Sequence, residues 1–289
     1  MDRPLIALGL QTVARQGAPH LVELGAVKVI EGEIEDTFDS LICPPVPIEP
    51  EASDWHGITE EDIRAAPHAA EVLDAFQIWA GDERLATHDA EEAATALAFE
   101  YARAELTPPG SPILDTRALA HHFMPEAEGH DLETLCAHLD LEEGEQRRGL
   151  ADAVWCWKVL EECLERRGRD DDGYGECLAL GHAPVTIPGQ RPKSPAPTRR
   201  VRQLEEARVG AAQVQLVYGA GASPASLRVL PRFLFDRGGH SYMEAECQMS
   251  GLLKTYRIDR IQRVDSGAGA GRASGLRPGT GLQRRKSLR

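Results

Sequence analysis

The chain has 289 residues, 42% of them hydrophobic, and a formal net charge of −14 at pH 7. At about 150 residues per domain, this length predicts two domains, and the apolar content is sufficient for their cores. The acidic balance excludes a uniformly basic nucleic-acid-binding protein and argues against a protein that lies on a membrane surface.

The charge is unevenly divided along the chain. Residues 1–168 carry 12 Lys and Arg against 35 Asp and Glu, a net charge of −23. Residues 169–289 carry 20 against 11, a net charge of +9. This division predicts two units that have different partners, or that attract each other through an acidic–basic contact.

Membrane and secretion signals are absent from the sequence. No apolar run reaches the ~18 residues of a membrane-spanning helix, so no membrane partner is expected. The apolar run at residues 5–10 is too short for a signal peptide and has too few basic neighbours. The six cysteines include no C-x-x-C pair, which is typical of reduced thiols in a cytoplasmic protein without a zinc site.

In chain order, the first part alternates short strands with helices. Apolar runs predict strands at residues 4–10, 20–30 and 33–42, the last two joined by a turn at Glu31-Gly32-Glu33. Thr59, followed by three acidic residues, predicts the start of a helix. Four more helices and two strands are predicted at residues 67–80, 90–106, 115–123 and 131–139 and at residues 84–88 and 112–114. This order predicts a mixed sheet flanked by helices.

The clearest helix covers residues 149–167. Its apolar residues recur at helical spacing and define one buried face: Leu150, Ala153, Val154, Trp157, Leu160 and Leu164. Asp152 lies outside this apolar face, in a position from which its carboxylate could line a cleft. The helix is expected to end near Gly168.

The second part changes composition. Residues 169–200 contain five prolines together with glycines and serines, which is typical of a linker. A short helix is predicted at residues 199–210, and short strands with glycine turns follow it. They predict a small all-β barrel over residues 201–265, separate from the first domain at residues 1–168. The glycine-rich, basic residues 266–289 are expected to be disordered.

Several segments occur in an order and spacing that resemble one enzyme family. They are LVELGAV (21–27), HGIT (56–59), LATHDA (85–90), ILDTRALAHHF (113–123), HDLETLCAHLDL (130–141) and RRGLADA (147–153). Residues 5–165 thereby resemble the proofreading 3′–5′ exonucleases of the DEDDh type, typified by the epsilon subunit of bacterial replicative polymerases. The resemblance implies an α/β, ribonuclease H-like fold and two-metal cleavage of phosphodiester bonds.

The positions that carry catalysis in that family are mostly replaced in this sequence. Its first Asp, its Glu, its second Asp, its general-base His and its final Asp align with Gly9, Gln11, Ala93, Arg147 and Asp152. Magnesium and manganese need several oxygen ligands, and arginine stays protonated and cannot act as a base. One retained carboxylate does not hold two adjacent dications. We therefore expect no two-metal hydrolysis and no cofactor.

Two local alternatives remain open around these positions. Arg147 either forms a bidentate pair with the Asp152 carboxylate or projects into solvent together with Arg148. Three acidic residues also precede Ala93, namely Asp89, Glu91 and Glu92. Their carboxylates either restore a Mg²⁺ or Mn²⁺ site with Asp152 or form an acidic first helical turn, which the helix dipole favours.

Residues 208–265 resemble a second family, the WYL domain of bacterial regulators, which is a small Sm-like barrel. The matching segments are VQLVY (214–218), RVLPRFLF (228–235) and KTYRIDRI (254–261), and the Trp-Tyr-Leu triplet aligns with Ser241-Tyr242-Met243. The resemblance implies that single-stranded nucleic acid or a nucleotide-like ligand is bound by Arg228, His240, Tyr242, Arg257 and Arg260. The alternative is a row of cations that docks on the acidic first domain.

Together these features predict a bacterial, cytoplasmic protein in which a catalytically inactive exonuclease-fold domain is fused to a WYL domain. Such a protein would act as a regulatory or scaffolding factor in DNA metabolism, repair or defence. One alternative is an active, atypical, metal-dependent 3′–5′ exonuclease that uses displaced carboxylates. Another is a protein-interaction module that does not bind nucleic acid.

Overall fold

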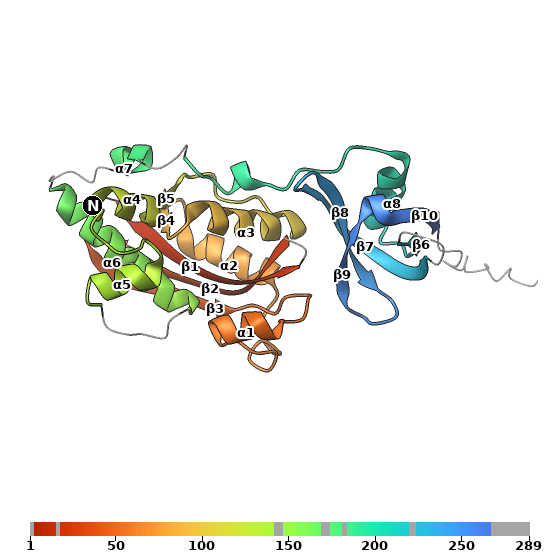
Figure 1. Cartoon of the computed structure of the whole chain (residues 1–289), viewed down its shortest axis with the longest axis horizontal. Helices are drawn as coiled ribbons and strands as arrows, with labels where there is room; N and C mark the ends of the chain where they lie inside the picture. Colours follow the sequence, from red (N-terminus) through yellow and green to blue (C-terminus); the bar gives the residue numbers. More distant parts are fainter. Residues whose placement is uncertain are drawn as a thin grey trace, which may run out of the picture.

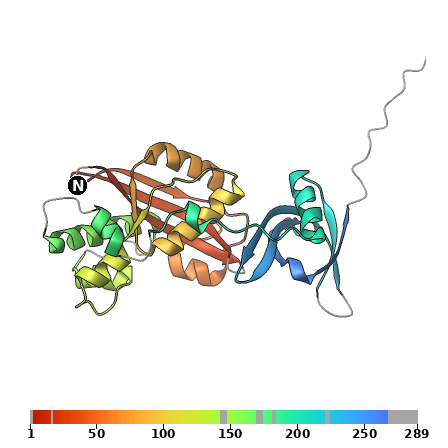
Figure 2. The same ribbon diagram turned by 90° about the horizontal axis from the view of Figure 1, so that it is seen from above.

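The structure is a computed structural model that describes residues 3–15, 18–141, 147–168, 174–180, 184–219 and 224–266. Two domains lie next to each other along the long axis of the molecule, joined by a linker (Figure 1, Figure 2). None of the described helices has the length and apolar content needed to cross a membrane. Apart from its first residue, the tail predicted at residues 266–289 lies outside the described residues.

A mixed five-stranded sheet forms the centre of the first domain, in the order β3-β2-β1-β4-β5. Its strands are β1 (Leu5–Arg15), β2 (Ala18–Ile30), β3 (Glu33–Leu41), β4 (Arg84–Thr87) and β5 (Ile113–Asp115). β2 pairs antiparallel with β1 and β3, and β4 pairs parallel with β1 and β5. The predicted mixed sheet is confirmed. β1 is longer than predicted because its pairing with β2 continues beyond an irregularity at Gln11/Thr12.

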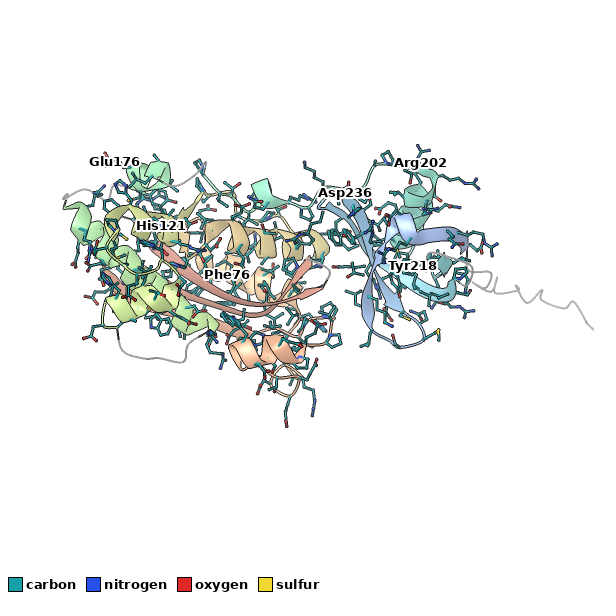
Figure 3. The ribbon with its side chains drawn as sticks, viewed as in Figure 1. Phe76, His121, Glu176, Arg202, Tyr218 and Asp236 are labelled. Atoms are coloured by element: carbon teal, nitrogen blue, oxygen red, sulfur yellow. The ribbon has the colours of Figure 1, made fainter. Side chains whose placement is uncertain are left out.

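Helices cover both faces of this sheet. They are α1 (Pro50–His56), α2 (Ala69–Ala80), α3 (Ala90–Arg103), α4 (Thr116–Phe123), α5 (Leu132–His138), α6 (Gly149–Arg167) and α7 (Tyr174–Leu180). Because side chains alternate along β1, Ile6 and Leu8 join a core with α2 and α3 that contains Phe76 (Figure 3). Leu5 and Ala7 join a second core with α4 and α6. The predicted apolar face of α6 lies in this second core.

The segment between β3 and α2 differs from the prediction. Thr59 makes the expected capping contacts, since its N–H donates to the Asp62 carboxylate and its hydroxyl accepts from the Asp62 N–H, but the chain continues only as a turn over residues 60–65. The helix lies earlier, at α1, where Pro50 takes a first-turn position and Gly57 ends the helix with φ 70°. Proline has the backbone angle of a first helical turn, and glycine readily adopts the left-handed end conformation.

The second domain consists of α8 (Arg199–Val209) and an antiparallel five-stranded sheet in the order β10-β6-β7-β8-β9. The strands are β6 (Val214–Tyr218), β7 (Ala225–Arg237), β8 (His240–Cys247), β9 (Leu253–Arg257) and β10 (Ile261–Ser266), with a 3-10 turn, η2 (Ile258–Arg260), before β10. The predicted closed barrel is not confirmed, because β9 and β10 are unpaired edges among the described strands. Alternating strands specify neighbour pairing, whereas closure depends on the stagger around the whole sheet.

The two domains also contact each other directly. Phe99 of α3 packs edge-on against Phe235 of β7, with ring centroids 5.2 Å apart. The linker contributes a short 3-10 helix, η1 (Pro188–Gln190), and a β-bridge between Lys193 and Asp236. The linker therefore lies against both domains instead of only spanning the distance between them.

Ion pairs join the domains, and the buried one has a polarity opposite to that of the net charges. Arg103 of α3 donates to both carboxylate oxygens of Glu244 of β8, at 2.8 and 2.9 Å, and Glu244 is 1% exposed. In this pair the acidic domain supplies the cation. The pair with the expected polarity, Arg208 of α8 with Glu105 at 2.9 Å, lies nearer the surface. Specific pairing, more than net charge, therefore joins the domains.

Candidate functional site

The positions aligned with the exonuclease motifs come together in the first domain. Gly9 and Gln11 lie on β1. Ala93 lies near the start of α3, while Arg147 and Asp152 flank the start of α6. All five line one cavity of about 490 Å³, which we call the cleft. The segments that carry these motifs therefore meet at one place in the fold.

The start of α6 packs directly on the sheet at glycine positions. A Cβ atom at Gly9 would lie 2.2 Å from the carbonyl oxygen of Gly149 and 2.8 Å from the Cβ of Asp152. A Cβ atom at Gly25 would lie 2.1 Å from the carbonyl carbon of Gly149. A side chain at either position thus requires the helix to move. The space that an aspartate at position 9 needs is filled by the backbone of α6.

A buried carboxylate anchors α6 in this position. Glu23 of β2 is 1% exposed and accepts hydrogen bonds from the Gly149 N–H at 2.6 Å and from the Arg148 guanidinium at 2.6 and 3.0 Å. Arg148 therefore does not simply project into solvent. Glu23 was not among the residues expected at this site, although a lone charge inside the apolar run LVELGAV indicates a buried ion that needs a partner.

Asp152 is the one carboxylate of the aligned set, and a neutral amide lies against it. Gln11 Nε2 donates to Asp152 Oδ2 at 2.7 Å. Burial raises the pKa of Asp152 to about 7, and the nearby Glu23 and Glu133 carboxylates act in the same direction. Hydrogen bonds from the Arg147 backbone and from Gln11 act against this rise. Near neutral pH, Asp152 is therefore a mixture of the protonated and ionised forms.

Arg147 adopts neither of its predicted positions. Its guanidinium donates to Glu133 of α5, with Nε 2.6 Å from Oε1, and lies 3.6 Å from the centroid of the Trp55 ring. The predicted bidentate pair with Asp152 is wrong, because the guanidinium makes its bidentate pair with Glu133 of α5 and lies over Trp55 of α1. This ion pair and cation–π contact form one wall of the cleft.

The acidic residues before Ala93 do not complete a metal site. Asp89 caps α3 by accepting a hydrogen bond from the Glu92 N–H at 3.3 Å, and its carboxylate pairs with Arg117 at 3.0 Å. Within the described part of the chain, no group of three or more His, Cys, Asp or Glu is placed to hold a metal ion. The geometry favours the acidic first turn over the restored metal site.

The residues of the cleft fit a divalent ion poorly. Magnesium takes oxygen ligands in nearly octahedral geometry, usually from carboxylates. Here Asp152 supplies the one carboxylate at the aligned positions, and the Gln11 amide directs its N–H to it instead of its oxygen. Gly9 has no side chain that could act as a ligand, and an aspartate at this position would require α6 to move. We therefore derive no metal-dependent step from this site.

Three of the predicted ligand-binding residues of the second domain lie together. Tyr242 of β8 is directly opposite Arg257 of β9 in the sheet register. Arg257 Nη2 lies 3.1 Å from Nδ1 of His240, and the same guanidinium pairs with Asp259 at 2.5 Å. A planar cation, an imidazole and a phenol ring thus share one surface, which we call the His240 cluster.

The other predicted residues of this domain differ in position. Arg260 lies on η2 next to Asp259, whose pKa is lowered mainly by its hydrogen bond with Arg257 and also by the Arg260 charge. Arg228 is exposed on β7 where that strand pairs with β6, away from the His240 cluster. Tyr242 is partly used by the fold, since its ring stacks on Phe235 at 5.4 Å. The cluster is therefore continuous with the contact between the domains.

Two families match this chain. The exonuclease family RNase_T matches residues 8–160, and the WYL domain family matches residues 199–266. Both resemblances predicted from the sequence are confirmed, and the two matched regions correspond to the two observed domains.

Curated relatives match the first domain. DNA polymerase III PolC-type of Oceanobacillus iheyensis is 34% identical over 150 residues, which is 50% of this chain and 10% of the polymerase. The PolC-type polymerase of Bacillus cereus is 31% identical over 167 residues, 56% of this chain and 12% of the polymerase. The matched region thus spans about a tenth of the length of these relatives.

Solved structures share the fold. The nuclease domain of 3′hExo, a DEDDh family member bound to rAMP, matches with a TM-score of 0.51 and 17% identity, over 57% of this chain and 92% of that chain. Exonuclease I in complex with the inhibitor BCBP matches with a TM-score of 0.50 and 10% identity, over 92% of this chain and 65% of that chain. At these identities the likeness is one of fold.

Proposed function

The chain belongs to the RNase_T exonuclease family, and on this premise we propose that it is a catalytically inactive member with a ligand-binding WYL domain. Its WYL domain binds nucleic acid or a nucleotide-like ligand, and the whole acts as a regulatory or scaffolding factor in DNA metabolism. The observation that carries this proposal is the packing of α6 on β1. The backbone at Gly149 fills the space that a metal-binding aspartate at position 9 would need.

The loss of hydrolysis follows from the chemistry of the cleft. Two-metal cleavage needs several carboxylates to hold the ions and a base that accepts the proton of the attacking water. Asp152 is the one carboxylate at the aligned positions, and it is hydrogen-bonded to the neutral Gln11. Arg147 is a permanent cation held by Glu133. The cleft keeps the shape of an exonuclease site without the groups that would activate water.

The charge of the cleft argues against nucleic-acid binding there without metal ions. Its charged lining residues are five carboxylates and two guanidinium groups: Asp89, Glu92, Asp131, Glu133, Asp152, Arg117 and Arg147. A net negative surface repels the phosphates of a strand, whereas lysines and arginines attract them. We therefore assign nucleic-acid or nucleotide binding to the second domain.

The His240 cluster supports this assignment. Arg257 offers a guanidinium that is suited to phosphate, and Tyr242 and His240 offer rings next to it. The same strand carries Glu244, which is held by Arg103 of the first domain. A ligand at the His240 cluster therefore acts on the strand that joins the domains, which is the basis for proposing a regulatory role.

The nuclease part is tested by mixing the full chain with single-stranded DNA labelled at its 5′ end, in Mg²⁺ or in Mn²⁺. We expect no metal-dependent shortening from the 3′ end. The control is Asp152→Asn, which preserves the size of the side chain and removes its charge. Metal-dependent shortening by the wild-type chain that disappears in this variant would overturn the proposal and favour an active exonuclease.

The binding part is tested by titrating a fluorescent single-stranded oligonucleotide with the full chain at several salt concentrations. We expect affinity to fall with salt, and Arg257→Ala to weaken binding about tenfold or more. The matched control is Arg263→Ala, because Arg263 pairs with Asp265 in the same way that Arg257 pairs with Asp259. Equal effects of the two substitutions, or no binding at any salt concentration, would contradict the assignment.

A further inference from the structure

A fully buried histidine lies where the two domains meet. His20 of β2 is 0% exposed. Its Nδ1 lies 3.7 Å from Oε1 of Glu100 of α3, and its Nε2 lies 3.5 Å from Oε1 of Glu244 of β8. Neither ring nitrogen has a hydrogen bond to any other group in the described part of the chain. We call His20, Glu100, Arg103 and Glu244 the interdomain ion cluster.

Without a proton on His20, the interdomain ion cluster carries one uncompensated negative charge. Arg103 donates to both oxygens of Glu244 and lies 3.1 Å from Oε1 of Glu100, so one guanidinium serves two carboxylates. Both carboxylates are buried, so water does not balance the excess charge. Burial acts to raise the pKa of Glu244, but Arg103 and His20 hold it well below its usual range. A buried ion needs a partner of opposite charge, and His20 is placed to supply it.

The positions of the two carboxylates also fit a protonated ring. An ionised carboxylate only accepts hydrogen bonds, whereas a neutral imidazole has one nitrogen that donates and one that accepts. A neutral His20 would therefore place a lone pair against Glu100 or Glu244. The imidazolium form has a donor on each side, so it satisfies both carboxylates together.

The other described neighbours of His20 change this balance little. Val13 of β1 lies opposite it in the sheet register. The apolar contact next to it, between the domains, includes the titratable ring of Tyr242. Arg237 of β7 is exposed and lies over the Phe99 ring, 5.5 Å from its centroid. Neither arginine nor tyrosine changes its charge appreciably between about pH 6 and about pH 9, so a change of charge in this range falls to His20.

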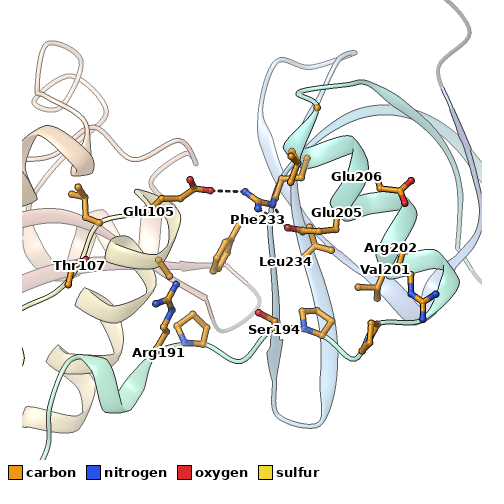
Figure 4. Close-up of a pocket in the computed structure, with 18 residues that line it drawn as sticks. Glu105, Thr107, Arg191, Ser194, Val201, Arg202, Glu205, Glu206, Phe233 and Leu234 are labelled. Atoms are coloured by element: carbon orange, nitrogen blue, oxygen red, sulfur yellow. Dashed lines mark hydrogen bonds and ion pairs between the residues drawn. The ribbon is translucent and has the colours of Figure 1, made fainter.

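The second ion pair between the domains shows why burial matters. Arg208 of α8 also faces two carboxylates, with Nη1 2.9 Å from Oε1 of Glu105 and Nη2 2.7 Å from Oε1 of Glu205 (Figure 4). These glutamate side chains are 73% and 44% exposed, so water compensates the second negative charge. Arg208 therefore needs no further cation beside it, whereas the interdomain ion cluster does.

We propose that docking of the two domains takes up a proton at His20, so that the docked arrangement is strongest at acidic pH and weakens as the pH rises. Histidine in water loses its proton at about pH 6.5. Undocking removes Glu244 from the ring and admits water, so the open form holds this proton less firmly. The form that binds more protons is favoured at low pH. The inference does not depend on the proposed function, because the interdomain ion cluster shares no residue with the cleft or with the His240 cluster.

The test is limited proteolysis of the full chain with a low concentration of trypsin at about pH 6 and at about pH 9. Trypsin cleaves after Lys193 of the linker, whose carbonyl oxygen accepts a hydrogen bond from the Asp236 N–H in the docked arrangement. The cleavage rate is divided by that of a short peptide with the sequence of residues 188–198 at the same pH, and it then follows the population of the open form. We expect this normalised rate to rise at least about tenfold between the two pH values. An unchanged normalised rate would overturn the proposal.

Variants assign the effect to the interdomain ion cluster, and circular dichroism verifies that each is folded. His20→Gln lacks the second cation at every pH, so its normalised rate should stay close to the rate of the wild type at the higher pH. Glu244→Gln leaves Arg103 balanced by one carboxylate, so it should be cleaved slowly at both pH values. The matched control is His122→Gln, an exposed position on α4, which should keep the wild-type response. A wild-type pH response retained by either His20→Gln or Glu244→Gln would refute the role of His20.

Discussion

Gly9→Ala is the most direct test of how α6 packs on the sheet. The new methyl carbon would lie 2.2 Å from the carbonyl oxygen of Gly149 and 2.8 Å from the backbone nitrogen of Ala153. These are backbone atoms of a helix, so no side-chain rotation relieves the contact. The start of α6 must shift, and the 2.6 Å hydrogen bond from the Gly149 N–H to Glu23 must lengthen or break.

The expected cost has two parts. Overpacking a well-packed core with one methyl group costs about 1–3 kcal/mol. Loss of the Gly149 hydrogen bond to the buried Glu23 carboxylate adds about 1.5–3 kcal/mol, because the acceptor is charged. We therefore expect Gly9→Ala to lower the free energy of unfolding by about 2.5–6 kcal/mol. For a chain of this size, the melting temperature falls by at least about 5 °C.

The assay is a urea titration followed by far-ultraviolet circular dichroism, with calorimetric melting as a second measurement. Gly110→Ala is the control, because a Cβ atom there meets no atom within 4 Å, and its stability should be unchanged or slightly higher. A Gly9→Ala protein with the unfolding midpoint of the wild type would refute the close packing of α6. The main reason for proposing an inactive site would be lost with it.

Three further predictions concern charged groups. The pKa of Asp152 is raised from 3.8 to about 7, so its contribution to stability is fully present below about pH 4 and is lost as the pH rises through about 7. In urea titrations, Asp152→Asn should therefore be more stable than the wild type at pH 8, by up to about 4 kcal/mol, and about equal to it at pH 4. Arg103→Met strands the buried Glu244 and Glu100 charges, so it should cost about 3–5 kcal/mol and speed proteolysis of the linker, and adding Glu244→Gln should recover part of this loss, since Glu100 stays ionised without its partner. Arg147→Ala should change the fluorescence of Trp55 and cost less than about 1 kcal/mol in urea titrations, because the ion pair that it breaks is near the surface.

Each of these predictions has an outcome that contradicts it. Parallel pH profiles for Asp152→Asn and the wild type would mean that the carboxylate is not held in a desolvating environment. No recovery on adding Glu244→Gln would mean that Arg103 does not act through Glu244. An unchanged emission spectrum for Arg147→Ala would remove the cation–π contact with Trp55.

Local pattern explains why much of the fold followed from the sequence. Alternating apolar residues identified the strands, and helical spacing identified the buried face of α6, because both patterns are set by the geometry of a single element. The prediction of a helix that begins at Thr59 was wrong for the same reason. A capping signal describes one turn of backbone, and the chain beyond that turn did not continue as a helix.

Motif spacing placed five residues in one cleft but did not predict their partners. The bond between Glu23 and Gly149 joins residues 126 positions apart, and the pair of Arg103 with Glu244 spans 141 positions. No local pattern encodes such a contact. The partners of Arg147 were likewise not predictable from its neighbours in the sequence, since they depend on the packing of α1 and α5 around it.

The sequence by itself indicated the two domains and the two family resemblances, and it led to the prediction that four of the five aligned catalytic side chains are replaced. These properties depend on residue identity and spacing, which a sequence contains. Only the tertiary structure decided that α6 occupies the space beside Gly9 and that the acidic domain supplies the cation of the buried interdomain pair. These properties depend on how closely separate elements approach, and that distance is set by side-chain volume and packing across the whole core.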